Sequence, residues 1–262
     1  MIRKIVVFIL FILFSYTGKG QEVEFNKINA LNWKTVFEDP GDVDWQKSWF
    51  LDGQRATIKN RDDGMLFSAG PIEKDDACHA VLWTKQSFKG DLKIEYDFTK
   101  MDNIKKAVVI IYIQATGTGK DPYANDIASW SQLRTIPYMS SYFNNMNLIH
   151  ISYAAFTNDN AKDKSDYVRA RRYPLIAGKK FSDMQVGESY YDTELFVPGI
   201  KYHISIIKKD DMVYMNVKGE GKSIYFQWDF SNHPEITEGR IGLRHMWTRC
   251  SKYANFKVSE LK

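Results

Sequence analysis

Histidine, tyrosine and arginine are concentrated in one stretch of the chain, residues 143–174 (FNNMNLIHISYAAFTNDNAKDKSDYVRARRYP). Residues 144–153 read as a β-strand with His150 on one face, whereas Ile149 and Ile151 lie on the other and predict a buried side. A polar run follows, and the chain then returns with the basic and aromatic segment YVRARRYP. An imidazole on a rigid strand, close to guanidinium groups, suits binding of an anionic sugar and proton transfer on it. Taken singly, each residue also fits a structural role.

These residue types match the requirements of β-elimination on a uronic acid. A cation or strong donor neutralises the C6 carboxylate, a base removes the C5 proton, and an acid protonates the leaving oxygen at C4. We predict that His150 and His79 share the base and acid steps, assisted by Tyr153 or Tyr173. A second set would hold the carboxylate or stack against the sugar ring: Arg171, Arg244, His245, Trp247, Arg249 and Trp130. The prediction requires strands that are distant in the chain to lie side by side in one sheet.

Several of these side chains are also explained as core residues. His79 alternates with Val81, and His245 shares a face with Leu243, which favours burial of both imidazoles. Arg244 lies on the opposite face from His245, where a neighbouring glycine leaves room for a ligand. A buried tryptophan is likewise the commoner outcome for the two candidate stacking residues. Both readings stay open at the level of the sequence.

The periodicity of the chain is that of β-strands. Apolar and polar residues alternate with period two over about ten or more short segments, and aromatic residues make up 15% of the chain. Segments 77–88 and 91–98 are predicted to form a hairpin, and residues 201–229 a three-stranded meander. Helices are scarce, with one short helix expected at 125–134. The pattern predicts an all-β protein, a jelly-roll β-sandwich of two antiparallel sheets.

The N-terminus has the pattern of a secretory signal peptide. Two basic residues precede an apolar run at 5–14, and a small and polar stretch follows it up to Gly20. We therefore expect a signal peptide at 1–20 and a single domain at 21–262, in the periplasm or secreted. No cysteine follows the apolar run, so a lipid anchor is not expected. Without the three basic residues of 1–20, the 36 Lys and Arg fall to 33 against 32 Asp and Glu, so neither nucleic-acid binding nor membrane insertion of the mature chain is predicted.

Two cysteines and one acidic loop are the remaining candidates for cross-links or metal sites. A disulfide between Cys78 and Cys250 is one possibility in an oxidising compartment, but their Cα separation cannot be read from the sequence. Neither cysteine has a second ligand at zinc spacing. The segment 157–163 (TNDNAKD) offers oxygen ligands for calcium without the fixed spacing of a known loop. We predict no metal, no cofactor and a monomeric protein.

Three segments together resemble the YesU-like family of concanavalin A-like lectin/glucanase domains. They are residues 79–98 (HAVLWTKQSFKGDLKIEYDF), 148–156 (LIHISYAAF) with the later 169–174 (RARRYP), and 239–258 (GRIGLRHMWTRCSKYANFKV). The resemblance implies two curved sheets with a glycan-sized groove on the concave face. It also implies a role near uronate-bearing polysaccharides, since some related proteins act as lyases or dehydratases on ulvan-type oligosaccharides.

The predicted function is therefore that of a carbon–oxygen lyase or dehydratase acting by β-elimination on uronic-acid-containing oligosaccharides or polysaccharides, with or without sulfate. One alternative is a non-catalytic carbohydrate-binding protein, which needs no histidine cluster. Another is a glycoside hydrolase with an atypical acid pair, Asp97 with Glu188 or Glu194. Glucanases of this superfold carry a Glu-x-Asp-x-x-Glu pattern, and the segment starting at Glu95 has Lys100 in place of the last acid.

Overall fold

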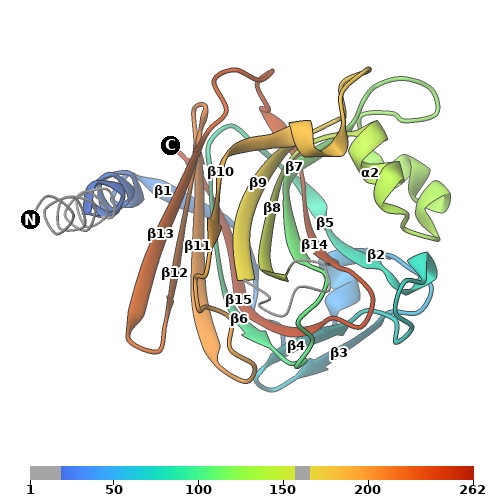
Figure 1. Cartoon of the computed structure of the whole chain (residues 1–262), viewed down its shortest axis with the longest axis horizontal. Coiled ribbons are helices and arrows are strands. Elements are labelled where there is room, and N and C mark those ends of the chain that lie inside the picture. Colours follow the sequence, from blue (N-terminus) through green and yellow to red (C-terminus); the bar gives the residue numbers. More distant parts are fainter. Residues whose placement is uncertain (1–18, 157–165) are drawn as a thin grey trace, which may run out of the picture.

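The computed structural model describes residues 19–156 and 166–262, which form a sandwich of two antiparallel β-sheets (Figure 1). In this described chain, eight strands form sheet A, in the order β13 (Lys222–Asp229), β12 (Met212–Gly219), β11 (Lys201–Lys209), β6 (Leu92–Lys100), β15 (Cys250–Leu261), β4 (Gly64–Ser68) and β3 (Thr57–Arg61), with β1 (Trp33–Asp39) paired to β15. Seven strands form sheet B, in the order β10 (Gln185–Tyr191), β9 (Asp166–Tyr173), β8 (Met146–Phe156), β7 (Val109–Gly117), β14 (Glu238–His245), β5 (Ala80–Lys89) and β2 (Trp49–Asp52). The predicted all-β jelly roll of two antiparallel sheets is confirmed.

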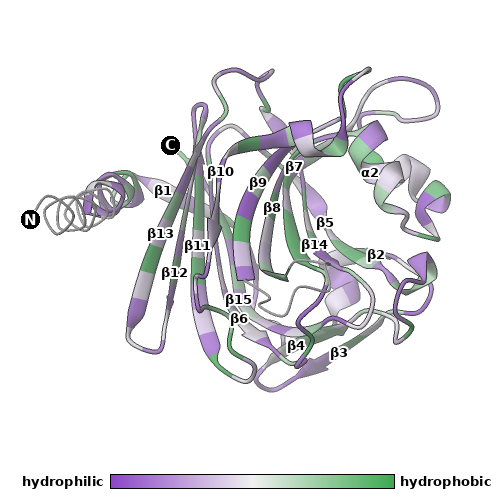
Figure 2. Cartoon of the chain, in the orientation of Figure 1, coloured by the Kyte–Doolittle hydropathy of each residue, from purple (hydrophilic) through white to green (hydrophobic). Residues whose placement is uncertain are grey.

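The hydrophobic core lies between the two sheets. Ile149 and Ile151 of β8 point toward sheet A, and Ile94 and Tyr96 of β6 point toward sheet B, each no more than 3% exposed. Burying one large apolar side chain of this kind contributes about 1.5–3 kcal/mol. Figure 2 shows the matching alternation of hydrophobic and hydrophilic residues along strands such as β13. The alternation that places Ile149 in the core places His150 on the outer face of sheet B, the face turned away from sheet A.

The predicted meander is confirmed, whereas the predicted hairpin at 77–98 is wrong. β11, β12 and β13 are consecutive antiparallel neighbours in sheet A. β5, however, pairs with β14 and β2 in sheet B, and β6 pairs with β11 and β15 in sheet A. The chain therefore crosses between the sheets at Gly90, whose φ is +65°. A tight turn with a positive φ serves a hairpin and a crossover equally well, so the local sequence does not separate them.

Helical segments lie outside the sheets. They are η1 (Trp45–Lys47), η2 (Asp76–Cys78), η3 (Ile127–Arg134), α2 (Met139–Asn145), η4 (Phe181–Met184) and residues 19–29. The helix predicted at 125–134 is found as the 3-10 helix η3, where the Asp126 carboxylate accepts a hydrogen bond from the Ala128 N–H group at 3.0 Å. η3 and α2 belong to the connection between β7 and β8. Ile127 and Tyr142 of this connection pack against Trp83 and Ile110 of sheet B, so it covers part of the outer face.

The N-terminal helical residues pack on the other side of the sandwich. Phe25 and Ile28 contact Ile207 and Tyr214 on the outer face of sheet A. The predicted signal peptide lies mostly in residues 1–18, outside the described part of the chain. No helix within residues 19–156 and 166–262 has both the length and the apolar composition required to cross a lipid bilayer.

Candidate functional site

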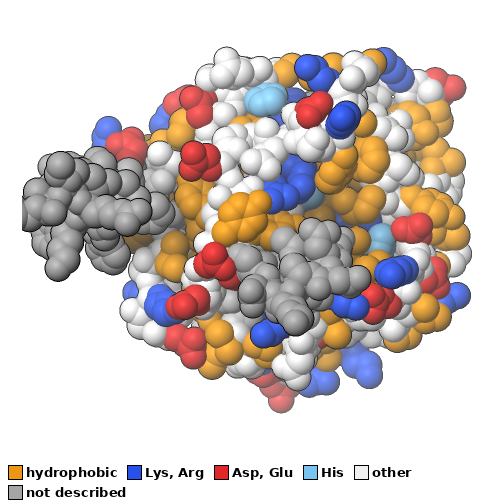
Figure 3. Space-filling model, viewed as in Figure 1, with side chains coloured by type: hydrophobic (Ala, Val, Ile, Leu, Met, Phe, Trp, Pro, Cys, Tyr) orange, Lys and Arg blue, Asp and Glu red, His pale blue; other side chains and the backbone are white. Residues whose placement is uncertain are grey.

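The candidate site lies on the outer face of sheet B, where β7, β8, β9 and β14 run side by side. His150 on β8 lies opposite Tyr112 on β7 and opposite Arg171 on β9 in the strand register. Arg244 on β14 and Tyr173 on β9 point to the same face. Figure 3 shows basic and histidine side chains in a hollow in the middle of this surface, over the strands β8, β9 and β14 of Figure 1. The sheet therefore brings together four of the predicted site residues, with Tyr112 between them.

His150 forms a hydrogen-bonded pair with Tyr173. The Nδ1 atom of His150 lies 2.7 Å from Tyr173 Oη, and Nε2 lies 2.6 Å from Ser152 Oγ. Burial lowers the pKa of His150 well below its ordinary value, and the positive charges of Arg171 and Arg244 lower it further. Burial also raises the pKa of Tyr173 well above 10. At neutral pH the pair is thus an uncharged imidazole beside a protonated phenol, one able to accept a proton and the other able to donate one.

Arg244 supplies a buried positive charge next to this pair. Its Nη2 group donates a hydrogen bond to the Pro137 carbonyl at 2.7 Å and lies 3.1 Å from His79 Nδ1, while its guanidinium lies 4.4 Å from the Tyr142 ring centroid. The Nε and Nη1 groups have no hydrogen-bond partner among the described residues. Buried donors of this kind are normally paired, so the two groups are unsatisfied donors in a residue that is 0% exposed.

Arg171 supplies the second positive charge. Its guanidinium lies 4.7 Å from the Phe181 ring centroid, the residue is 8% exposed, and its Nε group has no partner in the described chain. The Tyr112 hydroxyl is buried close to the Arg244 and Tyr173 side chains. Within residues 19–156 and 166–262, no carboxylate lies within ion-pair distance of Arg171 or Arg244. Two buried guanidinium groups without counter-ions favour an anionic ligand.

His79 lies on the same side of the sheet, but its imidazole contacts Arg244 and not His150. It is 2% exposed, and burial together with the charge of Arg244 lowers its pKa to about 3. No hydrogen bond in the described chain joins the two imidazoles. The predicted pair of catalytic histidines is therefore not formed, and Tyr173 takes the place beside His150.

A buried carboxylate, which the sequence did not reveal as special, fixes the connection between β7 and β8 to the sheet. Asp52 at the end of β2 accepts hydrogen bonds from Trp83 Nε1 at 2.7 Å, Arg134 Nε at 2.6 Å and Tyr142 Oη at 3.0 Å. Burial raises the pKa of Asp52, and the adjacent Arg134 guanidinium opposes that rise. Because Tyr142 also packs on Arg244, the Asp52 cluster holds the wall of the site in place.

Tyr153 and His245 lie in the sandwich core and not on the outer face. The Tyr153 ring packs at 5.1 Å from Phe98, and His245 stacks on Phe67 at 4.4 Å and lies 2.9 Å from Tyr253 Oη. Both have 0% exposure. Strand alternation is the reason, because each is one position away from a residue on the outer face. The structure corrects their predicted placement, because neither side chain reaches the candidate site.

Trp130, Trp247 and Arg249 are also structural in this conformation. Trp130 Nε1 donates to the Ala124 carbonyl at 2.9 Å, and the Arg134 guanidinium covers its ring at 4.1 Å. Trp247 is 7% exposed and packs in the cluster of Cys78 and Ala107. Arg249 donates to the Asp102 carboxylate at 3.1 Å and to the Ala154 carbonyl at 2.8 Å. None of the three offers its polar group or ring face to the candidate site, which corrects their assignment.

The space beside the glycine of β14 is filled by a tryptophan and not left for a ligand. A Cβ atom on Gly242 would lie 2.5 Å from the Trp83 ring, so the glycine accommodates that ring.

Tyr112 was missed as a site residue because it lies within the run VVIIYIQ, which reads as a core strand. In a strand, Tyr112 lies on the same face as Ile110 and on the face opposite Ile111, and this alternation could have identified it as a site residue.

The carboxylates of the hydrolase alternative are not brought together. Asp97 lies on the outer face of sheet A, 2.9 Å from His203 Nδ1 and 2.9 Å from Asn255 Nδ2. Glu188 lies on β10 of sheet B, and Glu194 forms an ion pair with Lys222 at 2.8 Å. A retaining or inverting pair must face one glycosidic bond from about 5–10 Å. Asp97 and Glu188 belong to different sheets, and Glu194 lies between β10 and β11 in its own ion pair.

The cysteines and the acidic loop add no metal site in the described chain. Cys78 and Cys250 are free thiols, and Cys250 Sγ lies 2.9 Å from Ser68 Oγ. The segment 157–163, considered above for calcium, lies outside the described residues. Among those described, no group of three or more His, Cys, Asp or Glu side chains is placed to hold a metal ion.

The three buried histidines predict a strong dependence of stability on pH. The pKa of His79 and of His245 is lowered to about 3, and that of His150 is also lowered, all mainly by burial. Below the unfolded value of about 6.5 the unfolded chain binds protons that the folded chain does not, so the free energy of unfolding falls as the pH falls from 6.5 toward 3. Each histidine contributes up to about 1.4 kcal/mol per pH unit in that window. Urea unfolding between pH 4.5 and 7.5 measures the slope, and His245→Gln should reduce it by about a third; an unchanged slope would contradict this account.

The fold and this surface define a lectin-type jelly roll with a buried, basic His–Tyr cluster on the outer face of one sheet. The chain belongs to the family described as Domain of unknown function (DUF1961), whose model matches residues 31–258. No curated protein sequence matches it.

Solved structures with the same fold come from several sources. A protein of unknown function with a galectin-like fold from Bacillus subtilis has a TM-score of 0.59 and 19% identity, covering 88% of this chain and 100% of its own. The seed lectin of Lotus tetragonolobus has a TM-score of 0.56 and 10% identity, covering 87% and 99%. The exoplasmic domain of VIP36, bound to Ca²⁺ and Man3GlcNAc, has a TM-score of 0.56 and 9% identity, covering 88% and 91%. At these identities the likeness shows the fold alone.

Proposed function

We propose that the protein binds an acidic oligosaccharide on the outer face of sheet B and carries out β-elimination at the His150–Tyr173 pair, as a carbon–oxygen lyase or dehydratase. One observation carries the proposal: the pair lies between two buried guanidinium groups that have no carboxylate partner in the described chain. The same residues supply the three functions that elimination requires, namely charge neutralisation, a base and an acid.

Binding comes first. The donors of Arg171 and Arg244 that have no partner in the described chain would hydrogen-bond the uronate carboxylate. Neutralising that carboxylate makes the C5 proton more acidic, because the carbanionic charge that develops at C5 spreads onto it. The carboxylate in turn offsets the two positive charges that lower the pKa of His150, so binding raises that pKa and strengthens the base.

The chemical step follows from the geometry of the pair. The C5–H bond breaks and its proton goes to the His150 imidazole, directly or through Tyr173 Oη. The C4–O bond breaks, a C4=C5 double bond forms, and the leaving oxygen takes a proton from the Tyr173 phenol. The Nδ1–Oη separation of 2.7 Å lets the imidazolium return a proton to the phenolate afterwards. No oxidant, reductant or metal is consumed.

The uronate of algal or pectin-like polysaccharides is the substrate class that the YesU-like resemblance suggests, and that narrower assignment remains a prediction. A leaving hydroxyl would make the reaction a dehydration, and a leaving sugar would make it chain cleavage. Both use the same pair of residues.

A second candidate function is carbohydrate binding without catalysis. Both ring nitrogens of His150 already have hydrogen-bond partners and the residue is 1% exposed, which also fits a structural imidazole. In that case Arg171 and Arg244 recognise an acidic sugar and no bond changes. The lectin-type fold is compatible with this function as well.

The test is incubation of the mature protein with uronate polysaccharides and with saturated oligomers that end in a uronate, followed by ultraviolet absorbance and mass spectrometry. Elimination predicts a new conjugated, ultraviolet-absorbing product, with loss of one water for a dehydratase or shorter chains for a lyase. Arg171→Gln should reduce the rate at least about 10-fold, since one charge-assisted contact is lost. If the ligands bind tightly but are recovered unchanged, the protein is a non-catalytic carbohydrate-binding protein. If new reducing ends form without an unsaturated product, the reaction is hydrolysis and the proposal is rejected.

A further inference from the structure

A second pocket lies next to the candidate site, on the far side of the loop that follows β9. Its volume is about 280 Å³, and its lining includes Arg172, Pro174, Ile176, Lys179 and His233. Several residues of the segment 174–184 line it, and Phe181 of the same segment covers Arg171 of the first site. The pocket therefore adjoins the His150 site and shares Tyr173 with it.

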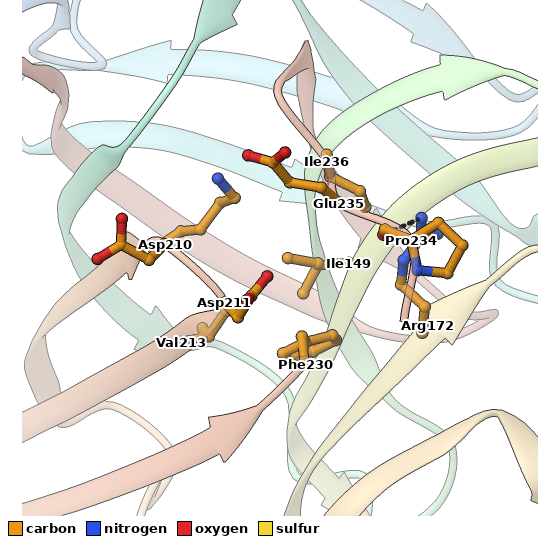
Figure 4. Close-up of a pocket in the computed structure, with 10 residues that line it drawn as sticks. Ile149, Arg172, Asp210, Asp211, Val213, Phe230, Pro234, Glu235 and Ile236 are labelled. Atoms are coloured by element: carbon orange, nitrogen blue, oxygen red, sulfur yellow. Dashed lines mark hydrogen bonds between the residues drawn. The ribbon is translucent and has the colours of Figure 1, made fainter. Parts of the chain in front are cut away.

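Arg172 is the buried charge of this pocket. It is 6% exposed, and burial lowers its pKa to about 10. Its guanidinium donates to the carbonyl groups of Tyr173 and Pro234, the second at 3.0 Å, and to Asn147 Oδ1 at 2.6 Å. All these acceptors are neutral, and no carboxylate in the described chain forms an ion pair with Arg172. Figure 4 shows Arg172 at an adjoining pocket, with the carboxylate of Glu235 directed away from the guanidinium, whose hydrogen bond to Pro234 is drawn.

The rim of the pocket adds positive charge and an apolar wall. Lys179 is exposed, and His233 is close enough to Arg172 that the guanidinium, after burial, lowers its pKa. Asp183, the one acid of the lining, already accepts hydrogen bonds from the Lys180 N–H group at 2.9 Å and from Ser182 Oγ at 3.2 Å. Ile176 is 64% exposed beside this rim, an unusual position for so large an apolar side chain.

A polar groove continues from this pocket. A depression of about 460 Å³ shares Asn147 and Pro174 with it and is lined further along by Thr116, Thr118 and Asn125. Its charged lining residues are Lys120, Glu235 and Glu238, so the anionic group of a ligand belongs at the Arg172 end. Because Asn147 Oδ1 accepts from Arg172, its amide N–H groups remain as donors to a ligand. Hydroxyl and amide groups beside an apolar wall suit the hydroxyl groups and ring faces of a sugar.

We propose that the pocket and groove form a second saccharide site, in which the Arg172 charge, with Lys179 and His233, holds the carboxylate or sulfate ester of a sugar residue whose ring lies against Pro174 and Ile176. The inference deepens the proposed function, on which it rests for the class of ligand, because it makes the ligand an oligosaccharide with at least two anionic groups. A tetrahedral sulfate and a planar carboxylate are recognised by the same donors, so the experiment separates them.

The test uses the full chain with isotope-labelled histidines, titrated with sodium sulfate, with glucuronate and with neutral methyl glucoside. The His233 ring signal reports the pocket, and the His150 signal reports the first site. Sulfate, glucuronate or both should shift the His233 signal and raise its pKa, because a bound anion stabilises the imidazolium. Affinity should accordingly increase as the pH falls through that pKa; the other charged groups around the pocket are Arg172, Lys179 and Asp183.

Variants make the outcome specific. Lys179→Gln, an exposed change that spares the fold, should weaken anion binding about fivefold, and Arg172→Gln should weaken it more. Lys218→Gln on the exposed side of β12 removes the same charge elsewhere and should have no effect. A His233 signal that ignores sulfate and glucuronate, or equal affinities in Lys179→Gln and Lys218→Gln, overturns the inference. A responsive His233 with an unresponsive His150 and no elimination supports the second site and rejects the proposed function.

Discussion

Replacing Tyr173 by phenylalanine should lower the rate of elimination about 100-fold or more while the affinity for oligosaccharide changes by less than about threefold. The variant removes only the Oη atom, which is 2.7 Å from His150 Nδ1, and leaves the buried ring in place. The loss should fall on kcat, because the phenol acts in the transition state and the guanidinium groups bind the ground state. Steady-state kinetics followed by ultraviolet absorbance, with KM and kcat separated, provides the measurement.

Ser152→Ala is the matched control for this prediction. It removes the hydroxyl on the other ring nitrogen, 2.6 Å from His150 Nε2, and so costs a buried hydrogen bond of similar kind. A proton-transfer role for Tyr173 requires a much larger rate loss in Tyr173→Phe than in Ser152→Ala, at a similar loss of stability of about 1–2 kcal/mol. Equal rates in the two variants would mean that the His150 cluster is structural.

The parts of the site that lie on one strand could be predicted from the sequence. Period-two alternation places His150 and Ser152 opposite Ile149 and Ile151, and the structure has this arrangement. The same rule set His245 on the face of Leu243, which is the core face. The binding role predicted for His245 went against this rule, and the imidazole is buried at the end of the strand.

The parts that depend on contacts distant in the chain could not be predicted. Asp52 and Arg134 are 82 positions apart, and neither has a local pattern that marks it as one half of a buried ion pair. The crossing of the chain between sheets at Gly90 is likewise decided by which strands neighbour β5 and β6. The residues of a turn determine its backbone conformation, but they do not determine which strand the following segment pairs with.

Asp52→Ala should have the largest effect on stability, lowering the free energy of unfolding by about 3–5 kcal/mol. The Asp52 and Arg134 side chains are both 0% exposed, so the substitution leaves a guanidinium buried without its carboxylate and two further donors without an acceptor. Urea unfolding at pH 7 measures the loss. Glu73→Ala, which breaks an exposed pair with Lys106 at 3.1 Å, is the control and should cost about 0–1 kcal/mol.

The double variant Asp52→Ala/Arg134→Met separates a broken ion pair from a cavity. With the uncompensated charge removed, it should recover a large part of the stability that Asp52→Ala loses, whereas a cavity alone would make the two losses add.

Sugar affinity of the Asp52→Ala protein provides a second readout. Tyr142 donates to Asp52 and packs on Arg244, so a loosened connection between β7 and β8 should weaken anion binding at Arg244 even where the fold survives. Unchanged affinity in a folded Asp52→Ala protein would show that Arg244 keeps its position without the anchor.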